Sequence, residues 1–306
     1  MDRVRQIADA VLYEGFILWP YRRSALKNQR RFTFGGVYPR GHSERHPDDR
    51  WTMRTECLVE GEAPAIDVRV RFLHVVERQV LDASRRPVDE LTVAGRRHLS
   101  WQEAAERELA PGPFAIAGGS DEEPLGDDGA IVRSWEPVEG SVDVSTETLA
   151  PGLRRVGVEI ANTTPFEGTR EEALRRTLCS THTVLRVGGG AFVSLTDPPA
   201  ALRESAAACR NQGTWPVLVG EPGSRDTLLC SPIILEDHPR IAPESPGDLF
   251  DGGEIDALLT LNILGLTEDE KAEMRDTDRR AREILERTEA LSEDELMRLL
   301  AARVQR

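Results

Sequence analysis

The stretch "IDVRVRFLHVV", residues 66–76, alternates apolar and polar residues. Within it, Val68, Val70 and Phe72 alternate with charged residues. Successive side chains of an extended strand point to opposite faces, so this spacing places the apolar side chains on one face and the charged ones on the other. The stretch therefore predicts a half-buried β-strand.

Strand-like stretches also dominate the second half of the chain. β-Branched residues bordered by Gly, Pro or Asp recur between residues 150 and 235, which predicts further strands. The segments are "LRRVGVEIANTT", "HTVLRVGGGAFVSLTD", "TWPVLVG" and "TLLCSPIIL". The glycines at 188–190 lie between two apolar alternations and predict a hairpin connection. Trp215 and Pro216 are expected to pack in the core.

Helices and loops are predicted to interrupt these strands. Apolar residues at helical spacing predict a helix over residues 3–13, and Ser100 with Glu103 forms a capping-box pattern that predicts a second helix over "SWQEAAEREL". "DPPAALRESAAAC" predicts a third, with Asp197 as its N-cap. The polar stretch 41–50 is expected to be a mobile loop, and the glycine-rich, acidic stretch 115–130 a surface loop.

The sequence after residue 250 is wholly helical in pattern. Three successive pairs have the spacing of a capping box: Asp251 with Glu254, Thr267 with Glu270, and Ser292 with Glu295. The charged helix that follows Thr267 is expected to stand mostly in solvent or to lie along a partner. We therefore predict an α+β fold, with a mostly antiparallel β body over residues 1–250 that is compatible with a sandwich and carries inserted helices. A helical region follows over residues 251–306.

Composition narrows the classes of function. The chain has 39 Lys and Arg residues and 53 Asp and Glu residues, so its formal net charge is -14. This negative charge disfavours a nucleic-acid partner recognised through its phosphates. The N-terminal stretch has no secretory-type apolar core, and we expect no membrane span. The four cysteines are far apart and are expected to be reduced, so the chain is expected to be cytoplasmic.

The acidic stretch "APESPGDLFDGGEID", residues 242–256, has two interpretations. Asp248, Asp251 and Asp256 could gather around a hard cation, since carboxylate oxygens suit calcium or magnesium. The spacing departs from the calcium-loop pattern at Phe250, so a capped entry into a helix is the favoured interpretation.

Two further groups of residues are candidates for catalysis. His182 follows Ser180 by two positions, so both would face one side of a strand, and Asp197 could orient the imidazole as in a triad. His238 and Glu244 follow an apolar strand and, with His182, Asp248 and Asp256, could form a metal or acid-base site. A satisfied strand-end histidine and a polar loop are the favoured alternatives. The sequence specifies no cofactor.

A contact surface is predicted near the N-terminus. Aromatic and polar residues mix within sixteen positions there, a combination that suits protein interfaces. The candidates are Tyr13, Glu14, Tyr21, Arg22, Lys27 and Asn28.

Long phrases of the chain resemble an uncharacterised bacterial family found in gene neighbourhoods of [NiFe]-hydrogenases. They include "VLYEGFILWPYRRSALKNQ", "STHTVLRVGGGAFVSLTDPP" and "SPIILEDHPRIAPESPGDLFDGGEIDALLTL". The resemblance covers both ends and the middle of the chain. It implies a cytoplasmic accessory role in assembly, maturation or operation of a hydrogenase, through contact with a hydrogenase subunit or a maturation factor. The alternative is a metal-assisted, hydrolase-like enzyme that uses His182, His238 and nearby carboxylates.

Overall fold

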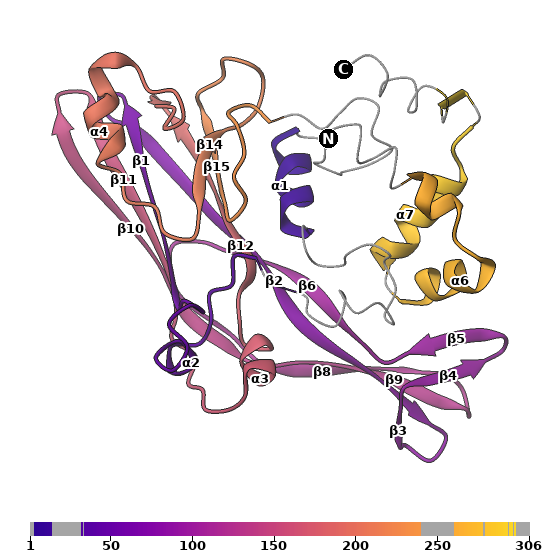
Figure 1. Cartoon of the computed structure of the whole chain (residues 1–306). Coiled ribbons are helices and arrows are strands. Elements are labelled where there is room, and N and C mark those ends of the chain that lie inside the picture. The colour runs from indigo at the N-terminus through magenta and orange to yellow at the C-terminus, as the bar shows by residue number, and fades with distance from the viewer. Residues whose placement is uncertain are drawn as a thin grey trace.

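The fold is built around one long strand, as the computed structural model shows (Figure 1). The structure describes residues 3–13, 32, 34–239, 260–277, 279–292, 294–295 and 297. Strand β2 (Ala65–Asp82) pairs with β12 (Cys179–Gly188) on one edge and with β6 (Trp101–Leu109) on the other. Farther along, β9 (Gly129–Trp135) replaces β12 as its neighbour, so β2 joins two successive parts of the sheet.

The strands form two main antiparallel sheets. Among the described residues, the first has five strands in the order β13-β1-β11-β10-β7, and the second has eight, with β14-β15-β12-β2-β9-β8 in one path and β3 and β6 paired to β2. The first sheet comprises β1 (Thr52–Glu60), β7 (Gly112–Ile116), β10 (Val138–Ala150), β11 (Leu153–Asn162) and β13 (Ala191–Phe192). The second adds β3 (Pro87–Val88), β8 (Gly119–Pro124), β14 (Trp215–Leu218) and β15 (Thr227–Ser231), and a separate hairpin pairs β4 (Glu90–Val93) with β5 (Arg96–Leu99).

The two main sheets share a hydrophobic core, here called the inter-sheet core. Val68, Val70 and Phe72 of β2 contribute to it from the second sheet, and Val156 and Val158 of β11 from the first. These side chains are at most 2% exposed. The predicted alternation of β2 is thus confirmed where the strand begins, and the shared core gives the body a sandwich-like arrangement.

The other face of β2 is covered by helices. Leu73 and Val75 pack with Leu12 of α1 (Arg3–Tyr13) and with Met274 and Leu285, which lie on α6 (Glu268–Thr277) and α7 (Arg279–Glu289). This second cluster, the helix-side core, draws together segments from both ends of the chain (Figure 1). Because β2 is covered on both faces, residues 70–76 are continuously buried and the alternation disappears. The other helices among the described residues are short: α2 (Arg40–Ser43), α3 (Arg170–Leu174), the 3-10 helix η2 (Ala200–Leu202) and α4 (Arg203–Ala207).

The structure confirms the predicted fold class and several local predictions. The fold is α+β, mostly antiparallel, with helices in the C-terminal region. The helix over residues 3–13 is present, and the capping boxes at Thr267–Glu270 and Ser292–Glu295 form with reciprocal hydrogen bonds. Asp251, Glu254 and the proposed boundary at residue 250 lie outside the described residues. The helices α6 and α7 share a hydrophobic core with the β body.

Several other predictions were wrong. "SWQEAAEREL" forms strand β6 and not a helix, because nine residues of β2 pair with it and its glutamates form cross-strand ion pairs. Residues 115–130 lie mostly at the surface as predicted, but they form largely the hairpin of β8 and β9 and not a loop. The glycines at 188–190 do not form a hairpin connection. They lead from β12 of the second sheet to β13 of the first, where β13 pairs with β1. Pro216 is buried as expected, but Trp215 on the edge strand β14 is 44% exposed.

Candidate functional site

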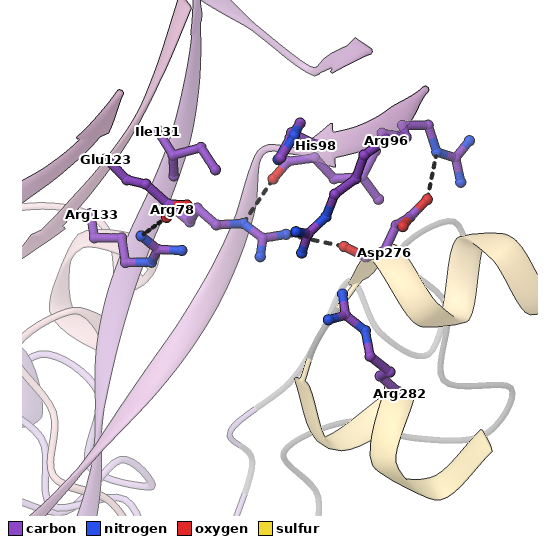
Figure 2. Close-up of a pocket in the computed structure, with 10 residues that line it drawn as sticks. Arg78, Arg96, His98, Glu123, Ile131, Arg133, Asp276 and Arg282 are labelled. Carbon is purple, nitrogen blue, oxygen red and sulfur yellow. Dashed lines mark hydrogen bonds and ion pairs between the residues drawn. The ribbon is translucent and has the colours of Figure 1, made fainter. Parts of the chain in front are cut away.

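A small cavity lies between the β body and the C-terminal helices, and we call it the arginine pocket. Its volume is about 70 Å³, room for a few water molecules or one small polar group. The lining residues are Arg78, Arg96, Arg97, His98, Leu99, Glu123, Ile131, Arg133, Asp276 and Arg282. Figure 2 shows them converging from β strands on one side and from α6 and α7 on the other. A cationic pocket is unexpected in a chain whose formal charge is -14.

The pairing register of β2 with β9 brings the first two arginines of the pocket together. Arg78 of β2 lies directly opposite Arg133 of β9, and like charges in this position repel each other. Glu103 of β6 offsets the repulsion, because it accepts hydrogen bonds from Arg78 Nη1 at 2.8 Å and from Arg133 Nε at 2.9 Å. Arg133 Nη1 also donates to Glu123 of β8 at 2.9 Å. These two arginines are therefore largely neutralised by carboxylates of neighbouring strands.

A tight turn supplies the second part of the pocket. Ala94 and Gly95, which connect β4 and β5, have φ angles of 50° and 80°. Two residues with positive φ are typical of a type I′ hairpin, whose twist matches that of the strands. The strand that leaves this turn begins with Arg96, Arg97 and His98, so the turn brings three nitrogen-rich side chains to the pocket.

The C-terminal end of α6 supplies the third part. The last carbonyl groups of a helix have no partner within the helix. Arg78 Nη2 donates to the carbonyl of Thr277 at 3.1 Å, and Arg282 of α7 donates to the carbonyl of Arg275 through Nε at 2.9 Å and Nη2 at 2.7 Å. Cations also interact favourably with the negative end of the helix dipole. These arginines therefore fasten α6 to both the β body and α7.

The remaining polar side chains leave the pocket positively charged. From the described residues, the carboxylate of Asp276 accepts one hydrogen bond, a long one of 3.4 Å from Arg97 Nε. Burial lowers the pKa of His98 from its ordinary value of 6.5, and the nearby Arg96 lowers it further, so this imidazole is mostly neutral at pH 7. Within the described residues, Arg96 and Arg282 have no carboxylate partner.

We expect Arg78→Met to lower the free energy of unfolding by about 2 kcal/mol. Methionine keeps the packed stem, but it leaves the carbonyls of Leu99 and Thr277 without their donor. Urea unfolding at pH 7 would measure the loss. Arg86→Met is the matched control, because Arg86 is 76% exposed and pairs with Asp82 on the surface. A loss equal to that of the control would contradict the fastening role of Arg78.

The predicted catalytic residue His182 is buried inside the fold. It lies on β12 and is 0% exposed, its Nδ1 lies 3.2 Å from the carbonyl of Ser180, and its Nε2 has no partner among the described residues. Burial, together with the charge of Arg71, lowers its pKa to about 4. The strand is irregular between Cys179 and His182, and Ser180 has a φ of 50°, so Ser180 Oγ donates to the carbonyl of Val11 and not to the imidazole.

The other catalytic candidates do not join His182. Asp197 is exposed and its backbone N–H donates to Ser194 Oγ; it is not the N-cap of a helix, because α4 begins at Arg203 and follows η2. His238 is half-buried, with its backbone N–H bound to the carbonyl of Leu218. Among the described residues, no hydrogen bond or ion pair joins any two of these three side chains, and no group of three His, Cys, Asp or Glu could hold a metal ion. Glu244, Asp248 and Asp256 lie outside the described residues.

Tyr13, a predicted contact residue, lies against the body. Its hydroxyl donates to Glu106 of β6 at 2.7 Å, and its ring packs beside the helix-side core. Glu106 also accepts from Arg71, which binds Asp9 of α1 at 2.6 Å. These contacts hold α1 on the sheet. The other predicted contact residues, Glu14, Tyr21, Arg22, Lys27 and Asn28, lie outside the described residues.

A second polar cluster orders the stretch that was predicted to be a mobile loop. His42 is 0% exposed, and its Nε2 lies 2.9 Å from Asp49 Oδ2. Arg170 donates to both oxygens of Asp49 and to the hydroxyl of Tyr38. Burial raises the pKa of Asp49, but the hydrogen bonds from Arg170 and His42 lower it by more, so the carboxylate stays charged. We interpret this cluster as a structural one that holds residues 38–49 against α3.

Sequence reasoning missed the arginine pocket because its members come from distant segments. Arg78, Arg133 and Arg282 carry no local motif, and only the run of Arg96, Arg97 and His98 after Ala94–Gly95 marks a turn with unusual charge. Within the described residues, none of the helices has the length and apolar character that crossing a bilayer requires. No model of a known protein family matches the chain, and neither does any curated protein with which it was compared.

Proposed function

We propose that this protein is a cytoplasmic accessory protein that acts by binding another protein in the assembly, maturation or operation of a [NiFe]-hydrogenase. The link to hydrogenases comes from the resemblance of long sequence segments of this chain to a family found in hydrogenase gene neighbourhoods. The binding role is supported by the arginine pocket, which offers directional hydrogen-bond donors at a junction between two parts of the fold. This pocket is the observation that carries the proposal.

Charge distribution favours recognition of a partner at this junction. An acidic protein repels acidic partners over most of its surface, so a cationic pocket selects the position at which an acidic group can bind. Arginine suits this task, because its planar fork forms two parallel hydrogen bonds to one carboxylate. The pocket therefore favours specific docking over general attraction.

The C-terminal helices contribute to this role through their outer surface. Their inner side chains, Met274, Ala281 and Leu285, are fully buried in the helix-side core. A partner protein would therefore bind to the charged outer surface of these helices and to the arginine pocket. Removing residues 267–306 would uncover Leu73 and Val75 of β2, so truncation would damage the body and is a poor test of partner binding.

The alternative, a metal-assisted enzyme built on His182 and His238, gains no support from the described residues. The imidazole of His182 is enclosed in the fold and is neutral at pH 7. His238 shares no hydrogen bond with it among the described residues. A substrate would have to reach a side chain that has no exposed surface.

Affinity purification of the tagged full chain from its own host would test the proposal. The host is grown under conditions that induce hydrogenase, and every retained protein is identified by mass spectrometry against a tag-only control. We expect enrichment of a hydrogenase subunit or a maturation factor. Recovery of the chain with no hydrogenase-related protein above the control would contradict the hydrogenase assignment.

A further inference from the structure

Two arginines of the pocket keep unused hydrogen-bonding capacity. Arg96 follows the β4–β5 turn and is exposed, and no side-chain partner for it occurs among the described residues. Arg282 spends Nε and Nη2 on one carbonyl and retains Nη1. Each guanidinium carries five N–H donors, so two sets of donors remain around one cavity of about 70 Å³.

The charge of the pocket limits what it can take. Arg78, Arg97 and Arg133 are each paired with at least one carboxylate, from Glu103, Glu123 or Asp276. Arg96 and Arg282 then supply the excess positive charge. Because Glu123 and Asp276 also line the cavity, a ligand with two negative charges would meet repulsion there. A group with a single negative charge fits best.

Carboxylates of the chain itself show how a group with a single negative charge binds to arginines of the pocket. Glu103 accepts from two arginines at once, and the carboxylate of Asp276 lies among the lining side chains, where Arg97 is its one donor among the described residues (Figure 2). Planar carboxylates are thus the anions that Arg78, Arg97 and Arg133 of the pocket already bind. An incoming carboxylate could use Arg96 and Arg282 while leaving the ion pairs of the other arginines intact.

From this geometry we infer that the arginine pocket binds a carboxylate side chain of an acidic peptide segment, with Arg96 and Arg282 as its principal donors. The inference rests on the proposed function in that the segment belongs to the bound protein partner. Occupancy would join β5 to α7 through one ligand, because Arg96 and Arg282 lie on these two elements. Asp276 stays next to Arg97 and excludes a second carboxylate.

Binding of a dye-labelled hexaglutamate peptide to the purified full chain tests this inference. We expect saturable binding by fluorescence polarisation and at least about a tenfold weakening in Arg96→Gln, since hydrogen bonds to charged groups contribute that much to affinity. Arg279→Gln is the control: this side chain is on α7 but is 79% exposed and pairs with Glu283. It should bind within about twofold of the wild type.

A second variant and a competitor sharpen the test. Arg282→Gln should also weaken binding about tenfold, and its melting temperature reports whether loss of the bonds to Arg275 has loosened the helices. Free glutamate should displace the peptide at lower concentration than inorganic phosphate does. The inference is overturned if hexaglutamine binds as well as hexaglutamate, if phosphate is the better competitor, or if Arg96→Gln binds like the control.

The same variants separate this inference from the proposed function. Capture of a hydrogenase protein that survives Arg96→Gln would overturn the role of the pocket and leave the accessory role in place. Peptide binding that depends on Arg96 and Arg282, without any hydrogenase protein in the purification, would support the carboxylate site and contradict the identity of the partner.

Discussion

Phe72→Ala should lower the free energy of unfolding by about 3–5 kcal/mol, a larger loss than we expect for any other single substitution described above. Phe72 is 0% exposed and lies in the inter-sheet core, where β2 of one sheet faces β11 of the other. Truncation removes the buried ring and leaves a cavity that closely packed neighbours fill only in part. Urea unfolding at pH 7, followed by tryptophan fluorescence, would measure the change.

Val144→Ala is the matched control for this prediction. Val144 also lies on an interior strand, β10, but its side chain is 40% exposed. Its truncation should change the free energy of unfolding by no more than about 0.5 kcal/mol. Equal losses in the two variants would contradict the packing of the two sheets around Phe72.

Acid should destabilise the fold between pH 6.5 and pH 4. Burial and the charge of Arg107 lower the pKa of His74 to about 4, while burial and Arg71 lower that of His182 to about 4, from an ordinary value of 6.5. The carbonyls of Glu136 and Arg175 lie near the ring of His74 without forming regular hydrogen bonds. As the pH falls through this window, the unfolded chain binds protons that the folded chain does not, so the equilibrium shifts toward unfolding.

The expected loss between pH 7 and pH 5 is roughly 2 kcal/mol for each histidine, or about 4 kcal/mol together. Urea unfolding at the two pH values would measure it. His182→Gln should reduce the pH dependence by about half, since the amide does not titrate. The same dependence in wild type and variant would contradict a neutral, buried His182. The carboxylate of Asp49, whose pKa lies below its ordinary value of 3.8, should lose its contribution only at lower pH.

Local chemistry made parts of the fold predictable from the sequence. Thr267 with Glu270 and Ser292 with Glu295 satisfy backbone donors within one turn, so their spacing specifies the helix start without help from the rest of the fold. The alternation at Val68, Val70 and Phe72 likewise reflects burial on one face of a strand.

Predictions failed where distant partners decide the structure. The segment 101–109 contains good helix formers, but β2 offers it a full set of backbone partners, and Glu103 and Glu106 find Arg78 and Arg71 across the strands. The order of residues 38–49 depends on Arg170, more than a hundred positions away. The arginine pocket needs the register of β2 with β9 and the docking of α7, neither of which a single sequence encodes locally.

The presence of Leu12 and Leu285 in one helix-side core has a consequence for biosynthesis. Leu285 follows Leu12 by more than 250 positions in the sequence, so this core closes only after Leu285 has left the ribosome. Until then, Leu73, Val75 and Trp101 present apolar surface on one face of β2 and β6. A nascent chain that lacks α7 should therefore be a good chaperone client, and its release from the chaperone should follow the docking of α7.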